Sequence, residues 1–222
     1  MPGLTECMGL NPASPPPMTL LLIRHGETAL NASRTMQPAD TPLSARGLAQ
    51  AEAVAARLSL LKPVAVLASD LPRALQTAQA IAAAAGGLPL QTSPLLHERN
   101  FGDLRGRPHA SLGFDALAMT EAPPNGESMA DFDDRADQAF ELALRLQATL
   151  DGPLVVVSHG LVIKSWLARR VTLPAGVDLP ARIGNTSVTR VSPQAPHAAD
   201  LVDCTAHLHG RLAEDGSSLS GG

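Results

Sequence analysis

Short apolar runs alternate along the chain with stretches in which apolar residues recur at helical spacing. The apolar runs are typical of strands buried on both faces, and they cover residues 19–24, 64–68, 88–92, 154–157, 186–191 and 200–204. The helical stripes cover residues 44–62, 72–85, 128–150 and 161–170. This alternation predicts the α/β class, a three-layer α/β/α sandwich with a mainly parallel central sheet of about six strands.

Several residues indicate where the predicted helices begin and end. Ser44 and Ser128 are N-cap candidates, and Asp131 completes a capping-box pattern with Ser128. Ser69-Asp70 are cap candidates for the second helix, and the glycine pair at 86–87 ends it. These signals separate the helices from the strands on either side of them.

One long segment has no sustained period. Residues 93–126, here called the insertion, contain Gly and Pro at 102, 106, 108, 113, 123 and 124. An irregular segment of this length is unusual inside a compact domain and is often functional, for example as a lid. A second polar loop is expected over residues 27–42.

The length of 222 residues suits one domain, which we place at residues 18–205. Residues 1–17 are rich in Pro and have no apolar signal-peptide core, so we expect a disordered leader, with Met18 as the functional start. Residues 206–222, rich in Gly and Ser, are expected to form a flexible tail. We expect a cytoplasmic protein.

Charge, hydropathy and cysteine content exclude several classes of function. The net charge of −4 argues against a general nucleic-acid binder, and no apolar run is long enough to span a membrane. Cys7 and Cys204 have no ligand-type spacing, so we expect neither a disulfide framework nor a zinc site. His207 and His209 lack a third ligand nearby and are read as surface residues. A homodimer is left open.

Reactive side chains follow three of the predicted strands. Arg24-His25-Gly26 comes after the first, Ser69-Asp70 with Arg73 after the second, and Ser158-His159-Gly160 after the fourth. Parallel strands end at one edge of a sheet, where α/β proteins place their ligands. An arginine fork binds phosphate oxygens and an imidazole nitrogen can attack phosphorus, so the pattern predicts a phosphate site. The alternative is that these are structural polar residues at strand ends.

The same residues belong to a longer series of motifs. In chain order they are Arg24-His25-Gly26-Glu27-Thr28 with Asn31; Asp40-Thr41-Pro42-Leu43-Ser44 with Gly47, Gln50 and Ala51; Ser69-Asp70-Leu71-Pro72-Arg73-Ala74 with Gln76-Thr77-Ala78; Glu98-Arg99-Asn100-Phe101-Gly102 with Gly106; Gly126-Glu127-Ser128; Ser158-His159-Gly160; and Asn185 with Ser187. From about Met18 to Cys204, this order resembles the histidine phosphatase superfamily, the phosphoglycerate-mutase-like group.

The resemblance implies a phosphoglycerate-mutase-like fold and a ping-pong phosphoryl transfer through a phosphohistidine. His25 would be the nucleophile, and Glu98 would protonate the leaving oxygen and then help to activate water. The transferring phosphoryl group would be held by Arg24, Arg73 and His159, with Asn31 as a further polar contact.

Physical chemistry sets requirements for these roles. His25 must attack in its neutral form, and we expect its other ring nitrogen to donate to a backbone carbonyl. His159 works best charged, and the helix that begins near Gly160 is expected to direct its N-terminal amides at the same anion. Glu98 needs a raised pKa, through burial or a neighbouring carboxylate. The alternative for Glu98 is a surface carboxylate paired with Arg99.

Positioned cations supply the charge that this chemistry needs, so we expect no metal and no cofactor. A metallohydrolase with His25 and His159 as ligands is a weaker alternative, and its nearest carboxylates are Glu27, Asp70 and Glu98.

Several other candidate residues have two possible roles each. Thr28 and Ser69 either contact phosphate or cap, Gly126-Glu127-Ser128 either lines the site or caps, and Asn185 is expected to brace the site. Three arginines of the insertion either bind the far end of an anionic substrate or form a solvated loop face: Arg99, Arg105 and Arg107. The remaining histidines, at 97, 109 and 197, have no evident role, and His197 lies in an expected turn.

The resembling mutases carry a Tyr where this chain has Phe101, and they grip a substrate carboxylate with Arg and Lys residues of the insertion. Between Pro108 and Asn125 this chain has no Lys or Arg. We therefore expect a phosphatase that acts on a small phosphorylated metabolite. The alternatives are a mutase and a non-catalytic protein that binds a phospho-ligand.

Overall fold

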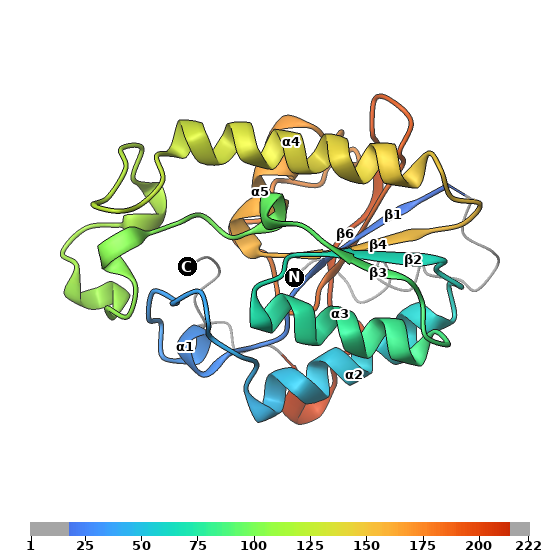
Figure 1. The fold of residues 1–222 in the computed structure, drawn as a ribbon, viewed down its shortest axis with the longest axis horizontal. Coiled ribbons are helices and arrows are strands. Elements are labelled where there is room, and N and C mark those ends of the chain that lie inside the picture. Colours follow the sequence, from blue (N-terminus) through green and yellow to red (C-terminus); the bar gives the residue numbers. More distant parts are fainter. Residues whose placement is uncertain (1–17, 214–222) are drawn as a thin grey trace.

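A six-stranded sheet forms the middle layer of the protein, seen in a computed structural model that describes residues 18–213 (Figure 1). The strand order is β3-β2-β4-β1-β5-β6. Only β5 runs against its neighbours, so the expectation of a mainly parallel sheet is confirmed. The strands are β1 (Leu20–Arg24), β2 (Ala65–Ala68), β3 (Leu90–Thr92), β4 (Leu154–Ser158), β5 (Val188–Val191) and β6 (Ala199–Cys204). The expected leader and the last part of the expected tail lie outside the described residues.

Helices cover both faces of this sheet. They are α1 (Ala29–Ala32), α2 (Ala45–Ser59), α3 (Pro72–Ala84), α4 (Met129–Gln147) and α5 (Gly160–Arg169). The pair α2 and α3 packs on one face, and the pair α4 and α5 packs on the other (Figure 1). The predicted three-layer α/β/α architecture is therefore confirmed. No helix within residues 18–213 is long and apolar enough to cross a membrane.

The apolar runs form the core because alternate residues of each strand point to opposite faces. In β1, Leu21 and Ile23 pack against α2 and α3, whereas Leu20 and Leu22 pack against α4 and α5. All four residues from Leu154 to Val157 of β4 are fully buried in the same way. Burial on both faces explains why these strands are continuously apolar rather than alternating.

Strand register brings the three motif-bearing strand ends together. Arg24 of β1 lies opposite Ser158 of β4, and Ala68 of β2 lies opposite Val157. The residues that follow these positions therefore emerge at one edge of the sheet, as the sequence predicted.

Two local predictions about helices are wrong. Residues 29–32 of the expected loop form α1, because Thr28 and Asn31 make a full capping box: the Asn31 backbone N–H donates to Thr28 Oγ1 and the Thr28 N–H donates to Asn31 Oδ1. The N-cap of α3 is Leu71, without a side-chain cap, rather than Ser69-Asp70.

The two other predicted N-caps, Ser44 and Ser128, are confirmed. Ser44 accepts a hydrogen bond from the Gly47 N–H, as an N-cap should. Ser128 caps α4 through the Asp131 N–H, but the Asp131 carboxylate accepts from the Ser128 hydroxyl and not from its backbone. The helix ends at Gln147, earlier than the expected 150.

The first part of the expected flexible tail packs on the domain. Leu208 is buried, and the side chain of half-buried His207 lies between Arg57 of α2 and Thr186. A short 3-10 helix follows at Gly210–Leu212, and the Leu212 carbonyl accepts from Gln50. Residues 206–213 are thus part of the folded structure. The expectation that His207 is a surface residue is wrong.

The insertion is irregular but has its own small core. It contains four 3-10 helices, Pro94–Leu96, Gly102–Leu104, His109–Ser111 and Ala116–Ala118, and it projects at the end of the molecule where α1 lies (Figure 1). A separate apolar cluster joins it to the loop after α1: Met36, Phe101, Leu104, Leu112 and Ala116. Gly102 has a positive φ of 50°, and a Cβ there would overlap the Pro124 carbonyl.

Candidate active site

Five side chains meet at the shared strand edge, and we call them the strand-end cluster: Arg24, His25, Ser69, Arg73 and His159. Each is at most 2% exposed. The rings of His25 and His159 are 5.1 Å apart between centroids, with their planes inclined at 60°. The sequence therefore predicted correctly that two histidines and two arginines converge.

The ring of His25 is held in one orientation. Its Nδ1 lies 2.7 Å from the Gly26 carbonyl oxygen, so Nδ1 carries the proton and Nε2 keeps its lone pair, as expected. Burial, followed by the charges of Arg73 and Arg24, lowers the pKa of His25 well below its ordinary value. The Asn185 Nδ2 donates to the His25 carbonyl at 3.0 Å, which is the bracing contact expected of Asn185. His25 is thus a neutral imidazole suited to nucleophilic attack.

Contacts of Gly26 that the sequence did not suggest fix the loop after His25. The Gly26 N–H donates to Thr77 Oγ1 at 3.1 Å, and that hydroxyl donates to the Arg73 carbonyl at 2.8 Å. Gly26 also lies so close to Gly47 of α2 that a Cβ on either would overlap backbone atoms. The missing Cβ at Gly26 thus allows the loop after His25 to lie directly against α2.

Hydrogen bonds to backbone carbonyls orient both arginines of the cluster. Arg24 Nη1 donates to the Ile183 oxygen at 2.6 Å. Arg73 Nη1 lies 3.4 Å from the oxygens of both Pro38 and Ala39, and its buried Nε has no hydrogen-bond partner among residues 18–213. Burial lowers the pKa of Arg73 to about 10, so the guanidinium remains charged at neutral pH. An anion between these side chains would meet two oriented cations.

His159 is the N-cap of α5 and lies opposite His25. Its Nε2 is 2.9 Å from Ser69 Oγ, and its buried Nδ1 has no partner within the described part of the chain. Burial, then the charge of Arg73 and more weakly that of Arg24, lower the pKa of His159 well below its ordinary value. Burial and two arginine cations thus disfavour the imidazolium in the free site, and the expectation that His159 works in its charged form stays a prediction for the site with phosphate bound.

Glu98 enters the same site from the insertion. It is 3% exposed, and its carboxylate accepts from the backbone N–H groups of Arg99 at 2.9 Å and Leu161 at 3.1 Å. Burial raises the pKa of Glu98 even though these hydrogen bonds and the charges of Arg73 and Arg24 act in the opposite direction. The alternative of a surface carboxylate is wrong. The Leu161 amide near the start of α5 therefore binds Glu98, which differs from the expectation that these amides face the phosphate.

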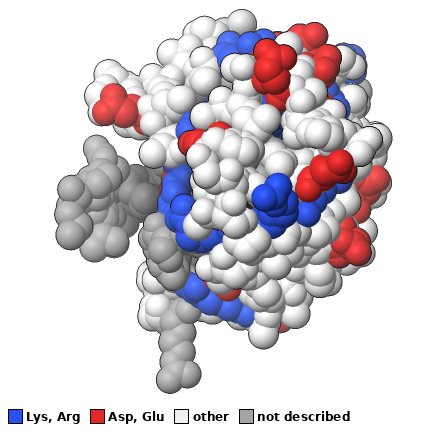
Figure 2. Space-filling view, turned by 90° about the vertical axis from the view of Figure 1, so that its left-hand side faces the viewer, with Lys and Arg blue, Asp and Glu red and all other residues white. Residues whose placement is uncertain are grey.

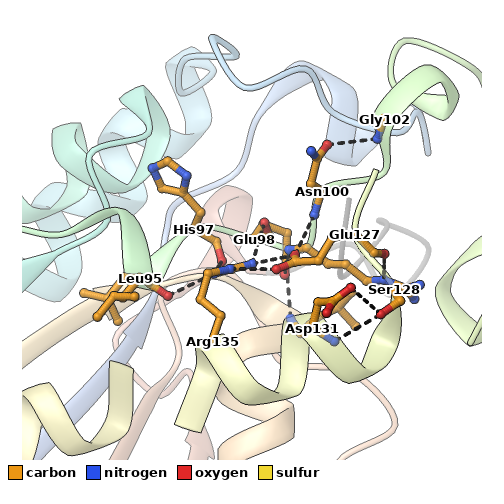
Figure 3. Close-up of polar contacts among 12 residues, drawn as sticks. Leu95, His97, Glu98, Asn100, Gly102, Glu127, Ser128, Asp131 and Arg135 are labelled. Carbon is orange, nitrogen blue, oxygen red and sulfur yellow. Dashed lines mark hydrogen bonds and ion pairs between the residues drawn. The ribbon is translucent and has the colours of Figure 1, made fainter. Parts of the chain in front are cut away.

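A network centred on Arg135 of α4 fixes the segment that carries Glu98 (Figure 3). The guanidinium donates to the carbonyls of Leu95 at 2.9 Å and His97 at 2.7 Å. It also forms two hydrogen bonds, of 2.8 and 2.7 Å, with the Glu127 carboxylate, which in turn accepts from the Asn100 N–H. The sequence reasoning missed Arg135 and left Glu127 as a lining or capping residue. Only the helical stripe of α4 hinted that residue 135 borders a buried face.

The three arginines of the insertion differ in their burial and in their contacts. Arg99 is buried, donates to the carbonyls of Glu127, Met119 and Glu121, and lies over the ring of Phe101 at 5.3 Å. It therefore holds the insertion together and is not available to a substrate. Arg107 is exposed, and Arg105 is half-buried.

Thr28 and Asn31 follow His25 in the sequence and serve as the cap of α1. Besides their capping box, the Thr28 hydroxyl donates to Gln37 Oε1 at 2.7 Å, and both residues are buried. A contact between either residue and a substrate phosphate stays a prediction, as does a role for Gly160, the first residue of α5.

The other histidines have structural partners. His97 contacts Asp70, His109 lies 3.2 Å from an Asp115 oxygen, and His197, in its expected turn, packs edge-on against Phe140. Within residues 18–213, no group of three His, Cys, Asp or Glu side chains is arranged to hold a metal ion.

Comparisons with known proteins agree with this geometry. Residues 20–201 match the family described as the histidine phosphatase superfamily (branch 1). Probable phosphoglycerate mutase GpmB of Yersinia enterocolitica is 38% identical over 187 residues, which cover 80% of this chain and 86% of that protein. The native structure of a mycobacterial glucosyl-3-phosphoglycerate phosphatase is similar with a TM-score of 0.66 and 32% identity, over 79% of this chain and 90% of that one. A putative alpha-ribazole-5'-P phosphatase from Escherichia coli gives a TM-score of 0.72 and 28% identity, over 85% and 97%.

Proposed function

Because this chain belongs to the histidine phosphatase superfamily (branch 1), we propose that it hydrolyses a small phosphorylated metabolite through a phosphohistidine intermediate. The observation that carries this proposal is the pairing of two buried groups with complementary protonation. Nδ1 of His25 is bonded to the Gly26 carbonyl, which leaves Nε2 free to attack, while burial raises the pKa of Glu98 and favours its protonated form. A nucleophile without its proton and an acid with one are what the first step requires.

In the first step, His25 Nε2 forms a bond to phosphorus and the phosphorus–oxygen bond to the alcohol breaks. Glu98 gives its proton to the departing oxygen, so the alcohol leaves neutral. Arg24 and Arg73 neutralise the charge on the equatorial phosphoryl oxygens, where it concentrates in the transition state.

In the second step, water attacks the phosphohistidine. The Glu98 carboxylate takes a proton from this water, the phosphorus–nitrogen bond breaks, and His25 returns to its neutral form. Inorganic phosphate leaves, and Glu98 is again protonated for the next cycle.

His159 would change its charge during the cycle. It is neutral in the free site, but a phosphate dianion beside it would favour the imidazolium. The buried Nδ1, which lacks a partner within residues 18–213, would then donate to a phosphoryl oxygen, while Ser69 keeps its contact with Nε2.

A mutase is the second candidate, because one similar protein is named a probable phosphoglycerate mutase. Two features favour hydrolysis. Phe101 is buried beneath Arg99 and has no hydroxyl to offer a bound intermediate, and the segment from Pro108 to Asn125 has no Lys or Arg. A mutase must retain its intermediate and exclude water, which these features do little to support.

The test is a panel of small phosphomonoesters assayed for phosphate release, beside an assay of 3-phosphoglycerate isomerisation. We expect release of phosphate, and we expect it to be abolished in His25→Ala. Efficient isomerisation with negligible hydrolysis would establish the mutase instead. Tight phosphate binding with no turnover of either kind would indicate a non-catalytic phospho-ligand protein.

A further inference from the structure

Arg105 is a half-buried cation that forms no ion pair with any of the described residues. Within residues 18–213, no side-chain hydrogen bond or ion pair engages its guanidinium. The carboxylate whose charge acts on Arg105 is that of Glu127, and this carboxylate is already bonded twice to Arg135. A partly desolvated guanidinium that lacks an acceptor is costly, and a planar fork of this kind suits a carboxylate or a phosphate.

Backbone hydrogen bonds place Arg105 beside the strand-end cluster. The Gly106 N–H donates to the Met36 carbonyl at 2.7 Å, and the Met36 N–H donates to the Arg107 carbonyl at 3.0 Å. The carbonyls that follow along the same segment, at Pro38 and Ala39, accept from Arg73. Arg105 and Arg73 therefore border one short stretch of chain.

The charge of Arg105 acts on the strand-end cluster through Arg73. The pKa of Arg73 is lowered first by burial and then by the charges of Arg105 and Arg24. The pKa of His25, by contrast, is lowered by burial and then by the charges of Arg73 and Arg24 alone. The charge of Arg105 thus acts on Arg73 and is not among the charges that lower the pKa of His25. Figure 2 views this end of the molecule and shows Lys and Arg side chains across the middle of the face, with Asp and Glu mainly toward its upper edge and right.

We propose that Arg105 binds a second anionic group on the substrate, so that the substrate is a phosphomonoester whose alcohol part carries a carboxylate or another phosphate. This inference rests on the proposed function, because it assumes that the transferring phosphoryl group lies between His25 and Arg73. Arg105 would be a specificity-determining residue that contacts the alcohol part and takes no part in bond breaking. It lies outside the segment from Pro108 to Asn125, whose lack of Lys and Arg favoured a phosphatase.

The experiment compares matched substrates that differ in one anionic group. For a carboxylate the pair is 3-phosphoglycerate and glycerol 3-phosphate, and for a phosphate it is fructose 1,6-bisphosphate and fructose 6-phosphate. The readout is the ratio of kcat/KM within each pair, measured for the wild type, Arg105→Met and Arg105→Lys. Arg107→Met is the matched control, because Arg107 lies in the same turn but is exposed.

We expect the wild type to prefer the doubly anionic member of at least one pair, and the pair that shows it identifies the group. Arg105→Met should lower that ratio by at least about tenfold, mainly through KM, whereas Arg105→Lys should retain part of it and Arg107→Met all of it. A ratio that Arg105→Met leaves unchanged, or equal losses on both members, would overturn the inference.

A binding measurement separates this inference from the proposed function. Calorimetry on His25→Ala gives the affinity for each member of a pair without turnover. If the wild type hydrolyses neither member but Arg105→Met in the His25→Ala background still removes the preference in binding, the proposed function fails and the Arg105 site stands. If hydrolysis proceeds without any preference, the Arg105 site fails and the proposed function stands.

Discussion

The strand-end cluster and the insertion meet in one site but are built in different ways. The cluster extends from strands whose register is set by backbone hydrogen bonds and by a core buried on both faces. Glu98, in contrast, lies in a segment without regular structure, and side-chain hydrogen bonds from Arg135 to backbone carbonyls hold it. In the proposed mechanism, the rigid sheet positions the groups that would bind the phosphoryl group, and the insertion positions the group that would protonate the leaving oxygen.

This division has a kinetic consequence. Loss of a phosphoryl-binding residue should slow every substrate to a similar extent, because every substrate carries the same phosphoryl group. The effect of losing the acid should depend on the leaving group. A nitrophenolate can leave without receiving a proton, whereas an alkoxide must be protonated as it leaves. Comparison of an alkyl phosphate with p-nitrophenyl phosphate therefore reports which region a substitution has damaged.

The largest effect is expected for Arg73→Met. The side chain is buried, charged and part of the same cluster as His25, so we expect a loss of about a thousandfold in kcat/KM, equal on both substrates. Arg73→Lys keeps the charge but not the fork and should recover only part of the rate. A loss confined to the alkyl phosphate would contradict the assignment of Arg73 to the phosphoryl group.

Glu98→Gln comes next. We expect a loss on the order of a hundredfold on the alkyl phosphate and a much smaller loss on p-nitrophenyl phosphate. Similar losses on the two substrates would remove Glu98 from the role of acid.

The pH profile gives an independent check on the same residue. Burial raises the pKa of Glu98, and the acid works protonated, so kcat/KM should fall as pH rises through this raised pKa. Glu98→Gln should abolish that alkaline limb. Because the pKa of His25 is lowered, its protonation should limit the rate only well below pH 6.5.

A smaller effect of the same kind is expected for Arg135→Met. This variant removes the hydrogen bonds to the Glu98 segment without touching substrate, so we expect a loss of about tenfold on the alkyl phosphate and less on p-nitrophenyl phosphate. Arg145→Met, on the exposed face of the same helix, is the control and should change neither. An equal loss on both substrates would mean that Arg135 acts on the fold as a whole.

The last effect concerns stability and leaves the rates on both substrates unchanged. Burial, then the charges of Arg57 and His209, lower the pKa of His207 to about 3 from 6.5. The unfolded chain therefore takes up this proton first as pH falls, and the stability linked to His207 is complete above pH 6.5 and is lost as pH falls toward 3. The loss is at most about 1.4 kcal/mol for each pH unit in this window.

His207→Gln should accordingly flatten the fall in unfolding free energy between neutral and mildly acidic pH, as measured by urea denaturation. His25 and His159 contribute falls of their own that the substitution leaves in place. An unchanged slope would show that His207 is not buried in its neutral form.

Much of the strand-end cluster could be predicted because it follows the strongest patterns in the sequence. Runs such as Leu154 to Val157 have one plausible environment, a strand covered on both faces, and parallel strands share a carboxyl edge. The position of His25 and His159 at one edge follows from those two facts. The tautomer of His25 could also be predicted, since the nucleophilic nitrogen must be the one that is free of the backbone.

The hydrogen bonds that hold the insertion in place could not be predicted. They join residues that are far apart in the sequence, and the insertion has no periodic pattern that would indicate its contacts. Arg135 looks like an ordinary polar position of an amphipathic helix until the carbonyls of residues 95 and 97 are seen beside it. The charge state of His159 in the free site could not be predicted for a related reason. Its protonation depends on burial and on the nearness of Arg73, which strand order alone does not give.

The most direct test of the central claim is the chemical trapping of the intermediate. The protein is mixed with a radiolabelled phosphomonoester, quenched in alkali to preserve acid-labile phosphohistidine, and mapped by mass spectrometry. We expect label on His25 at Nε2, because Nδ1 is bonded to the Gly26 carbonyl, and no label in His25→Ala. Rapid turnover without labelled protein, or with the label on another residue, would contradict the account.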